Sequence, residues 1–266
     1  MTGGGDRILE ADEDDHHLAA SVATEAGRLL LAVREELAHA ESKVLRDEGD
    51  RRSHDRICEL LARARPGDAV LSEEAADDAA RLRSPRVWIV DPLDGTREFS
   101  EPPRDDWAVH VALWARNGSA EGSLVAGAVA LPGMATTLAT AEPPALAAAV
   151  DGPIRLVVSR TRPPALVEAL TEALGAVLVP MGSAGAKAMA VVRGEADGYV
   201  HAGGQYEWDS AAPAAVAAAA GLHTSRIDGS PLLYNRPDPL LPDLVICRPE
   251  LAGVLLEAIA VATPPT

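Results

Sequence analysis

Two carboxylates close together follow a short apolar run near residue 90. The run at 87–90 (VWIV) predicts a buried strand, and residues 91–96 (DPLDGT) come directly after it. The proline of this hexapeptide has no N–H for strand pairing and restricts the residue before it, so we expect the strand to stop at Asp91. A turn at Asp94 then lets Thr96 begin or cap a helix. Both carboxylates and the Thr96 hydroxyl are therefore expected to converge on one point, as the ligands of a metal ion would.

Two further acidic clusters lie where an apolar segment ends or a helix begins. A strand predicted at 69–71 runs into Glu73, and Asp209 lies at the start of an alanine-rich helix. By itself, the pair Glu73-Glu74 is more typical of a helix N-terminus, where the helix dipole favours acidic side chains. Carboxylates that are brought together repel and raise one another's pKa, and a bound divalent cation removes that penalty.

The donors in these clusters suit magnesium rather than zinc. Mg²⁺ prefers hard oxygen ligands and keeps several waters, and the sequence has no cluster of Cys or His with the spacing of a zinc site. If Asp91 bridges two ions, they would lie about 3.5 to 4 Å apart, which suits activation of a water on one side of a phosphorus atom. The candidate ligands are Glu73, Asp91, Asp94 and Asp209, with the carbonyl oxygen of Leu93.

The composition limits the partners that this chain can take. Of its 266 residues 47% are hydrophobic, yet no apolar stretch is long enough to span a bilayer, so we expect a globular protein with a substantial core and no membrane span. A formal charge of −16 disfavours nucleic acid and anionic membranes as partners. The first residues lack the features of a signal peptide and the two cysteines form no disulfide framework, so we expect a cytoplasmic location.

The elements that must position the acidic clusters follow from the apolar periodicity. Residues 1–150 read as an α+β part, in which a polar segment at 43–49 separates the first two helices. The predicted elements here are helices at about 18–37 and 50–64, and strands at 69–71, 87–90, 107–114, 124–131 and 135–139.

Breaks rich in proline and glycine predict a subdomain boundary near residue 150. Strands and helices alternate after it, which indicates an α/β part at 151–266 with a loop at Gly203-Gly204. The predicted elements are strands at 154–158, 176–179, 199–200 and 244–246, and helices at about 163–174, 183–192, 207–221 and 249–260.

Four short motifs occur in this chain in a specific order: Glu73-Glu74, residues 88–96 (WIVDPLDGT), residues 182–184 (GSA) and residues 208–212 (WDSAA). Taken together, they make the chain resemble the inositol monophosphatase and fructose-1,6-bisphosphatase superfamily of Mg²⁺-dependent, lithium-sensitive phosphatases. The D-P-x-D-G-[ST] motif alone occurs by chance in unrelated turns, whereas the ordered set is highly specific. The resemblance implies a layered α-β-α-β-α sugar-phosphatase fold of the α/β class (α+β in some schemes), with the active site between its two parts.

The resemblance also implies a role for each acidic residue. One Mg²⁺ would be held by Glu73, Asp91 and the Leu93 carbonyl. A second would be held by Asp91, Asp94 and Asp209, and a third, weaker ion would join near Glu73. Two or three Mg²⁺ ions are therefore the expected cofactors.

Catalysis in this superfamily is direct attack of water on the phosphate, without a phosphoenzyme. The implied catalytic residues are Thr96, Glu73, Asp94 and Asp50. The Thr96 hydroxyl would orient the water, and the N–H groups of Gly95 and Thr96 would receive the phosphate. Family members have V-T-x-A-D before the second helix; residues 46–50 (RDEGD) retain its Asp as Asp50 but lack its Thr, which bears on lithium sensitivity.

Within the superfamily, residues 207–212 (EWDSAA) are similar to the 3′(2′),5′-bisphosphate nucleotidases, which remove the 3′-phosphate of adenosine 3′,5′-bisphosphate. His201 stands about where inositol-specific members have a hydroxyl-binding Glu. Residues 96–100 and 104–107 are similar to the actinobacterial branch that serves sulfate assimilation. The resemblance further implies a homodimer.

The implied substrate is a small phosphorylated metabolite, and three residues that could lie near it have competing interpretations. Lys187 either approaches a second phosphate or is a solvated helix lysine. Arg160 ends a predicted strand, where its forked donors suit a phosphate but also an ordinary surface position. Tyr206 either joins the core or stacks on adenine, whereas the core is favoured for Trp107 and Trp114. The full set of expected substrate contacts is Leu93, Asp94, Gly95, Thr96, Ser183, Lys187, Glu207, Asp209 and Arg160.

Three functions stay open at this point. The leading hypothesis is a bisphosphate nucleotidase that acts on adenosine 3′,5′-bisphosphate (PAP), with PAPS as a further candidate substrate. The alternative enzyme is an inositol-1-phosphate or fructose-1,6-bisphosphate phosphatase, or one of dual specificity. A non-enzymatic sensor of phosphorylated metabolites is the third, and the intact set of acidic residues with Thr96 argues against it.

Overall fold

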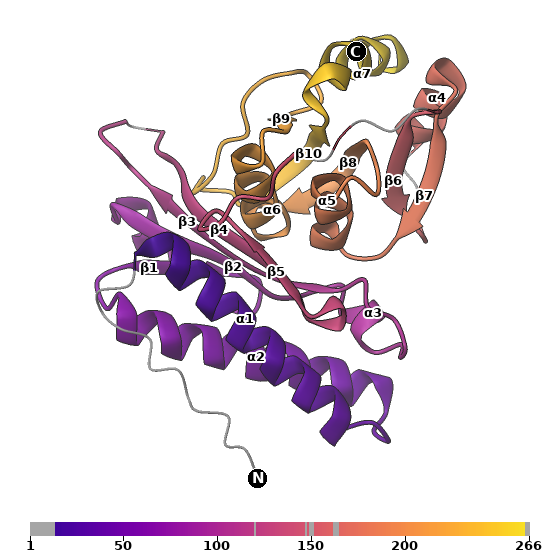
Figure 1. Ribbon diagram of the computed structural model, residues 1–266. Helices are drawn as coiled ribbons and strands as arrows, with labels where there is room; N and C mark the ends of the chain where they lie inside the picture. The colour runs from indigo at the N-terminus through magenta and orange to yellow at the C-terminus, as the bar shows by residue number, and fades with distance from the viewer. Residues whose placement is uncertain (1–13, 120, 147, 149–151, 162–164, 264–266) are drawn as a thin grey trace.

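The protein is built as five alternating layers of helices and sheets (Figure 1). The computed structural model describes residues 14–119, 121–146, 148, 152–161 and 165–263. Figure 1 shows α1 and α2 on one side of a first sheet, α5 and α6 between this sheet and a second one, and α4 and α7 beyond the second sheet. The layered α-β-α-β-α fold predicted from the sequence is therefore confirmed.

The first sheet and its outer helices come from the N-terminal half of the chain. Its strand order is β1-β2-β3-β4-β5, and only the β1–β2 pair is parallel. The elements are α1 (Asp15–Glu36), α2 (Ser42–Ala64), β1 (Ala69–Ser72), the 3-10 helix η1 (Ala79–Arg83), β2 (Arg86–Asp94), α3 (Thr96–Phe99), β3 (Ala108–Ala115), β4 (Ser123–Leu131), the 3-10 helix η2 (Pro132–Met134) and β5 (Thr136–Ala139).

The second sheet has the order β7-β6-β8-β10-β9. Strand β6 lies parallel to β7 and β8, whereas β10 is antiparallel to β8 and β9. The elements are β6 (Arg155–Ser159), α4 (Ala165–Leu174), β7 (Val177–Met181), α5 (Ala184–Val192), β8 (Gly198–Tyr206), α6 (Glu207–Ala219), β9 (His223–Ser225), β10 (Leu240–Cys247), the 3-10 helix η3 (Pro249–Leu251) and α7 (Ala252–Ala262).

Burial on both faces explains why the strands read as continuous apolar runs. In β2, Val87 and Ile89 face the layer of α5 and α6, whereas Trp88 and Val90 face α1 and α2. A strand covered on both sides needs apolar residues at successive positions rather than at alternate ones.

No helix in the described part of the chain is both long enough and apolar enough to cross a membrane.

Several element boundaries differ from the sequence-based predictions. Helix α2 begins at Ser42, so the polar segment 43–49 is helical rather than a loop. Strand β8 runs through the predicted loop at Gly203-Gly204, because β10 pairs with β8 on both sides of an irregularity at these two glycines. Strand β9 was not predicted. The predicted boundary near residue 150 falls beside residues 149–151, and the prolines expected to open α4 are residues 163 and 164; both lie outside the described residues.

Candidate active site

Three carboxylates from two distant parts of the chain meet between the sheets. Asp91 and Asp94 come from the end of β2, and Asp209 comes from the first turn of α6. Each offers an oxygen, and these three oxygens lie within 4.8 Å of one another. Asp91 is 1% exposed and Asp94 is 8% exposed, so this group of three, the acidic cluster, is largely withdrawn from water.

An irregularity in β2 places both of its aspartates on one face. Asp91 pairs with His110 of β3, and Asp94 pairs with Ala108, so two residues of β2 oppose one residue of β3 between these pairs. Such a bulge shifts the alternation of side chains by one position. Leu93 consequently packs on the α1–α2 side, and Asp94 shares the face of Asp91. The prediction that the strand stops at the proline was wrong, because pairing resumes beyond it.

The hexapeptide ends as the sequence predicts. Gly95 has φ +87°, a left-handed conformation that favours glycine, and Thr96 begins the short helix α3. The N–H of Leu93 donates to Asp91 Oδ1 over 3.0 Å. The Thr96 hydroxyl donates to the Leu93 carbonyl over 3.3 Å. Thr96 therefore follows Asp94 closely in the chain, and its hydroxyl contacts the carbonyl that was predicted to bind metal.

Two hydrogen-bond donors and the ring of His110 surround one oxygen of Asp94. Its Oδ2 accepts hydrogen bonds from the Ser183 hydroxyl and from the N–H of Gly185, the latter over 2.6 Å, and His110 Nε2 lies 3.2 Å away. These contacts hold the carboxylate so that its other oxygen is left for the acidic cluster. Ser183 also caps α5, because its Oγ accepts the N–H of Ala186. Ser183, which was predicted to contact the substrate, therefore orients Asp94 in this structure.

His110 is a functional candidate that the sequence-based prediction missed. It is fully buried in β3, and its Nδ1 lies 3.0 Å from the carbonyl oxygen of Trp208, which can only accept a hydrogen bond. Burial lowers the pKa of His110, but Asp94 outweighs this effect and raises it overall. A Cβ at Gly185 would lie 2.0 Å from His110 Nε2, so only glycine fits there. The available signal was a single titratable residue within an apolar strand.

Asp209 is positioned by its own helix start. Its Oδ2 accepts the N–H of Tyr206 over 2.6 Å, which closes the first turn of α6. Burial and the charge of Asp94 raise the pKa of Asp209 to about 6. Burial and the charge of Glu73 also raise the pKa of Asp91 well above its usual value. Charge repulsion of this kind is relieved when a cation binds.

Glu73 lies next to the acidic cluster, and Asp50 lies near Glu73 on another element. Glu73 follows β1 as an exposed residue in a turn, although its carboxyl is partly desolvated and lies close to Asp91. This desolvation, with the charges of Asp209 and Asp94, raises the pKa of Glu73 to about 7. Asp50 is half-buried on α2, where burial and the charges of Glu74 and Glu73 raise its pKa to about 7. The turn at Glu73 is not the helix start that its sequence typically indicates.

Buried arginine contacts tie the segment after Glu73 to the helix of Asp209. Arg81 is 2% exposed and forms two hydrogen bonds with Asp77 and one, 2.6 Å long, with Asn235 Oδ1. The N–H groups of Asn235 and Arg236 donate to the Glu207 carboxylate over 2.6 and 2.7 Å. The segment after Glu73 and the first turn of α6, which carries Asp209, are therefore joined through the 235–236 loop.

Three residues that were expected to contact the substrate have their charged groups engaged with protein. Glu207 is 1% exposed and both of its oxygens accept backbone N–H groups, so its place in this structure is to hold the 235–236 loop. Lys187 is buried, with Nζ donating to the carbonyls of Gly182 and Ser183, so the solvated-lysine interpretation was wrong. Arg160 pairs with Glu98 and Glu101, each over 2.7 Å.

Lys187 supplies a buried cationic group near this region, on α5. Its pKa is lowered by burial, an effect opposed by the charges of Asp94, Glu98 and Asp209. Its Nζ also lies 5.3 Å from the ring centre of Tyr199. The ammonium group therefore compensates part of the negative charge of the acidic cluster. Because its own hydrogen bonds go to backbone carbonyls, the carboxylate oxygens of the cluster are left for other ligands.

The donor set fits hard divalent cations. The mutually close atoms are the carboxylate oxygens of Asp91, Asp94 and Asp209. Within the described residues this is the one group of three or more such side chains placed to hold a metal, and it includes no Cys or His. Oxygen-only ligand sets suit Mg²⁺, Ca²⁺ or Mn²⁺, of which Mg²⁺ commonly works with a few carboxylates and a substrate phosphate.

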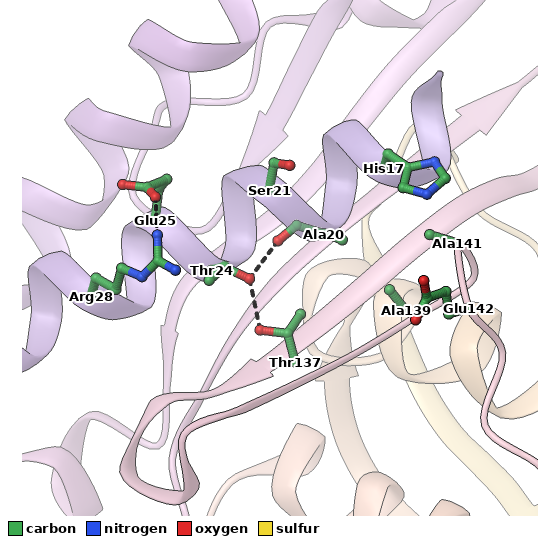
Figure 2. A pocket seen from close by; sticks show the side chains of 10 residues that line it. All are labelled: His17, Ala20, Ser21, Thr24, Glu25, Arg28, Thr137, Ala139, Ala141 and Glu142. Carbon is green, nitrogen blue, oxygen red and sulfur yellow. Dashed lines mark hydrogen bonds and ion pairs between the residues drawn. The ribbon is translucent and has the colours of Figure 1, made fainter. Parts of the chain in front are cut away.

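A separate groove lies along the outer edge of the first sheet (Figure 2). It has a volume of about 300 Å³ and is lined by α1 and by β5 with the residues after it. In it, the hydroxyls of Thr24 and Thr137 lie 2.8 Å apart, and Arg28 pairs with Glu25. None of its lining residues belongs to the acidic cluster, so the groove is distinct from the candidate metal site.

Comparisons with known proteins agree with this geometry. Residues 12–262 match the inositol monophosphatase family. The chain is 55% identical over 239 residues to a protein of Mycobacterium tuberculosis named 3′-phosphoadenosine 5′-phosphate phosphatase, covering 89% of this chain and 90% of that protein. A Mycobacterium leprae protein of the same name is 51% identical over 260 residues, covering 95% and 96%.

More distant relatives extend the same likeness. The 3′(2′),5′-bisphosphate nucleotidase CysQ of Escherichia coli K12 is 31% identical over 194 residues, covering 69% of this chain and 76% of that protein. Among solved structures, CysQ from Bacteroides thetaiotaomicron superposes with a TM-score of 0.76 at 26% identity, covering 88% of this chain and 97% of the other. Inositol monophosphatase II from Staphylococcus aureus, with a TM-score of 0.73 and 20% identity over 91% and 92% of the two chains, shares the fold.

Proposed function

Because this chain belongs to the inositol monophosphatase family, we propose that it is a Mg²⁺-dependent phosphatase that converts adenosine 3′,5′-bisphosphate to AMP and phosphate. The observation that carries the proposal is the meeting of Asp91, Asp94 and Asp209 in a chain 55% identical to a protein named for this activity. The enzyme would work in the cytoplasm as a homodimer, would be inhibited by lithium, and would serve sulfate assimilation.

The proposed metal ligands are those implied by the sequence. Asp91, Asp94 and Asp209, with Glu73 and the Leu93 carbonyl, would hold two Mg²⁺ ions and a weaker third. Bound Mg²⁺ would neutralise the substrate phosphate and make the attacking water more acidic. Their supporting contacts, on Asp94 Oδ2 and Asp209 Oδ2, leave one oxygen of each carboxylate for this purpose.

The remaining residues would position the reacting groups. The Thr96 hydroxyl, next to the Leu93 carbonyl, would orient the attacking water, with Asp50 and Glu73 available to hold its protons. The N–H groups of Gly95 and Thr96 would receive the phosphate. Attack in line with the departing 3′-oxygen then breaks the phosphorus–oxygen bond, and the ribose hydroxyl leaves with a proton. In this proposal Glu207 and Arg160 support the site rather than touch the substrate.

A comparison of three substrates tests the specificity. We expect kcat/KM for adenosine 3′,5′-bisphosphate to exceed the values for inositol 1-phosphate and fructose 1,6-bisphosphate by at least about tenfold, because polar and stacking contacts to a nucleotide add to those made to phosphate. The assay measures phosphate release with and without lithium at one fixed Mg²⁺ concentration. A higher kcat/KM for either sugar phosphate would replace the nucleotidase proposal by the alternative enzyme. Binding of all three without turnover would favour the sensor.

Magnesium should also stabilise the folded protein. At about 100 times its dissociation constant, Mg²⁺ adds about 2.7 kcal/mol of stability, or roughly 5 °C or more in Tm for a chain of this size. The raised pKa values of Asp209 and Glu73, about 6 and 7, mean that these groups stabilise the metal-free fold at low pH and lose that contribution as pH rises through 6 to 7. The Mg²⁺-induced shift in Tm is therefore expected to be larger at pH 8 than at pH 5.5.

Differential scanning fluorimetry with Mg²⁺ or EDTA measures this shift. Na⁺ at matched ionic strength is the control for screening, which acts on all surface charges rather than on one site. An equal shift at the two pH values, or the same shift with Na⁺, would contradict binding at the acidic cluster.

A further inference from the structure

One exposed aromatic side chain belongs to a residue whose backbone contacts the acidic cluster. The chain has one Phe, four Trp and three Tyr, and all eight lie in the described residues. Tyr206 is 45% exposed, whereas Trp208 is half-buried and the other six are buried. An aromatic ring that is left in water costs hydrophobic free energy. Because most of the aromatic side chains of this protein are buried, the exposure of Tyr206 calls for an explanation.

The Tyr206 ring is held in a fixed orientation. It stacks on Trp208 with ring centres 4.7 Å apart and an angle of 9° between the planes. One face of the Tyr206 ring is therefore covered, and its exposure belongs to the opposite face and the edge. A π face that is held rigidly and left uncovered is the arrangement that proteins use to stack a nucleobase.

The backbone shortly before Tyr206 is open on one side. Gly203 and Gly204, just before it on β8, are exposed and have φ values of +139° and +87°. A Cβ at Gly203 would meet no atom within 4 Å, and one at Gly204 would meet only Leu240, 4.0 Å away. The backbone here is therefore not covered by other protein atoms, and a ligand can approach it closely.

Tyr206 is also connected directly to the acidic cluster. Its backbone N–H donates to Asp209 Oδ2 over 2.6 Å. A ring attached to this residue lies within the span of one nucleotide from the carboxylates. Because the connection to Asp209 runs through the backbone, a change of the Tyr206 side chain leaves this hydrogen bond in place.

From these contacts we infer that the uncovered face of Tyr206, backed by Trp208, is the stacking surface for the purine base of a nucleotide whose phosphate is bound at the acidic cluster. This inference rests on the proposed function and adds a base-recognition residue to it. Stacking on an aromatic side chain tolerates different bases, so the inference concerns affinity for a planar base rather than a choice of adenine.

Substitution of Tyr206 tests the inference through the balance of KM and kcat. Tyr206→Ala is expected to raise KM for adenosine 3′,5′-bisphosphate about tenfold or more, with the loss in kcat/KM arising chiefly from KM. It should weaken AMP as a competitive inhibitor by a similar factor while inorganic phosphate inhibits as before. Tyr206→Phe and Tyr206→Trp keep an aromatic face and are expected to retain KM within about threefold of the unsubstituted protein.

The outcomes separate this inference from the proposed function. If the unsubstituted protein does not hydrolyse adenosine 3′,5′-bisphosphate, the proposed function and the stacking surface both fail. If it does, and Tyr206→Ala leaves KM and AMP inhibition unchanged, only the stacking surface fails. Equal weakening of AMP and inorganic phosphate would show damage to the acidic cluster and would also overturn the inference. Measuring the Tm of each variant with Mg²⁺ verifies that the metal-bound fold is retained.

Discussion

Replacing Asp94 or Asp209 by Asn is expected to reduce Mg²⁺-dependent phosphate release by about a thousandfold while the fold remains intact. Each change removes a negative charge where we place divalent cations, and such groups supply a large part of the stabilisation of a transferring phosphoryl group. The size of the side chain is unchanged, so packing around the acidic cluster is preserved.

The hydrogen bonds of the two aspartates explain why Asn cannot substitute. Oδ2 of Asp94 accepts donors from Ser183 and Gly185, and Oδ2 of Asp209 accepts the Tyr206 N–H. An Asn must turn its single oxygen toward these donors, which leaves its NH₂ facing the acidic cluster. An NH₂ group donates hydrogen bonds and does not bind a cation.

Stability measurements make this prediction specific. Asp209→Asn removes a carboxylate whose pKa is raised and should leave the metal-free Tm unchanged or higher, whereas Asp94→Asn removes a charge that His110 and Lys187 stabilise and should lower it. In both variants the Mg²⁺-induced rise in Tm should be largely lost. Asp105→Asn, at an exposed position outside the acidic cluster, is the matched control and should retain both activity and the Mg²⁺ effect. Retention of more than about a tenth of the activity in either Asp94→Asn or Asp209→Asn would contradict the two-metal assignment.

The second large effect is expected at His110. His110→Ala should lower kcat/KM by about 10- to 100-fold, the range typical for residues that orient metal ligands. The imidazole joins Asp94 on β2 to the Trp208 carbonyl at the start of α6, so its loss loosens the two elements that bring Asp94 and Asp209 together. It also leaves a cavity and an unpaired carbonyl, which together cost roughly 3 to 5 kcal/mol of stability.

A conservative variant distinguishes positioning from a general loss of stability. Gln can reach either Asp94 or the Trp208 carbonyl but not both, so His110→Gln is expected to recover part of the activity. Both variants should raise the Mg²⁺ concentration needed for half-maximal rate. Ser183→Ala removes a different donor to the same Asp94 oxygen, and this variant should raise the required Mg²⁺ concentration to a smaller extent. If His110→Ala loses stability while its Mg²⁺ dependence is unchanged, His110 is structural only.

The layers and most elements of this fold were predictable because the apolar patterns are strong. A strand buried on both faces, such as β2, reads as an uninterrupted apolar run, and α1 shows its apolar stripe directly. The start of α2 was not predictable from pattern, because residues 43–49 are polar and their helix is stabilised by packing further along.

The sequence indicated the candidate metal ligands, but not the backbone irregularity and hydrogen bonds that position them. The proline beyond Asp91 indicated a strand end, whereas the structure resumes pairing after a bulge, and this bulge is what brings Asp94 to the face of Asp91. Glu207 looked like a substrate contact because it stands two residues before Asp209. Its buried hydrogen bonds to the 235–236 loop depend on a segment nearly thirty residues away, which local sequence does not reveal.

The central claim is that this acidic cluster cleaves the 3′-phosphate of adenosine 3′,5′-bisphosphate with the aid of Mg²⁺. The most direct measurement incubates purified protein with this nucleotide, with Mg²⁺ or with EDTA, and identifies the product by ³¹P NMR. We expect one inorganic phosphate per nucleotide and adenosine 5′-phosphate as the product, with Mg²⁺ only. Release of phosphate in EDTA, formation of adenosine 3′-phosphate, or an unchanged nucleotide in the presence of Mg²⁺ would contradict it.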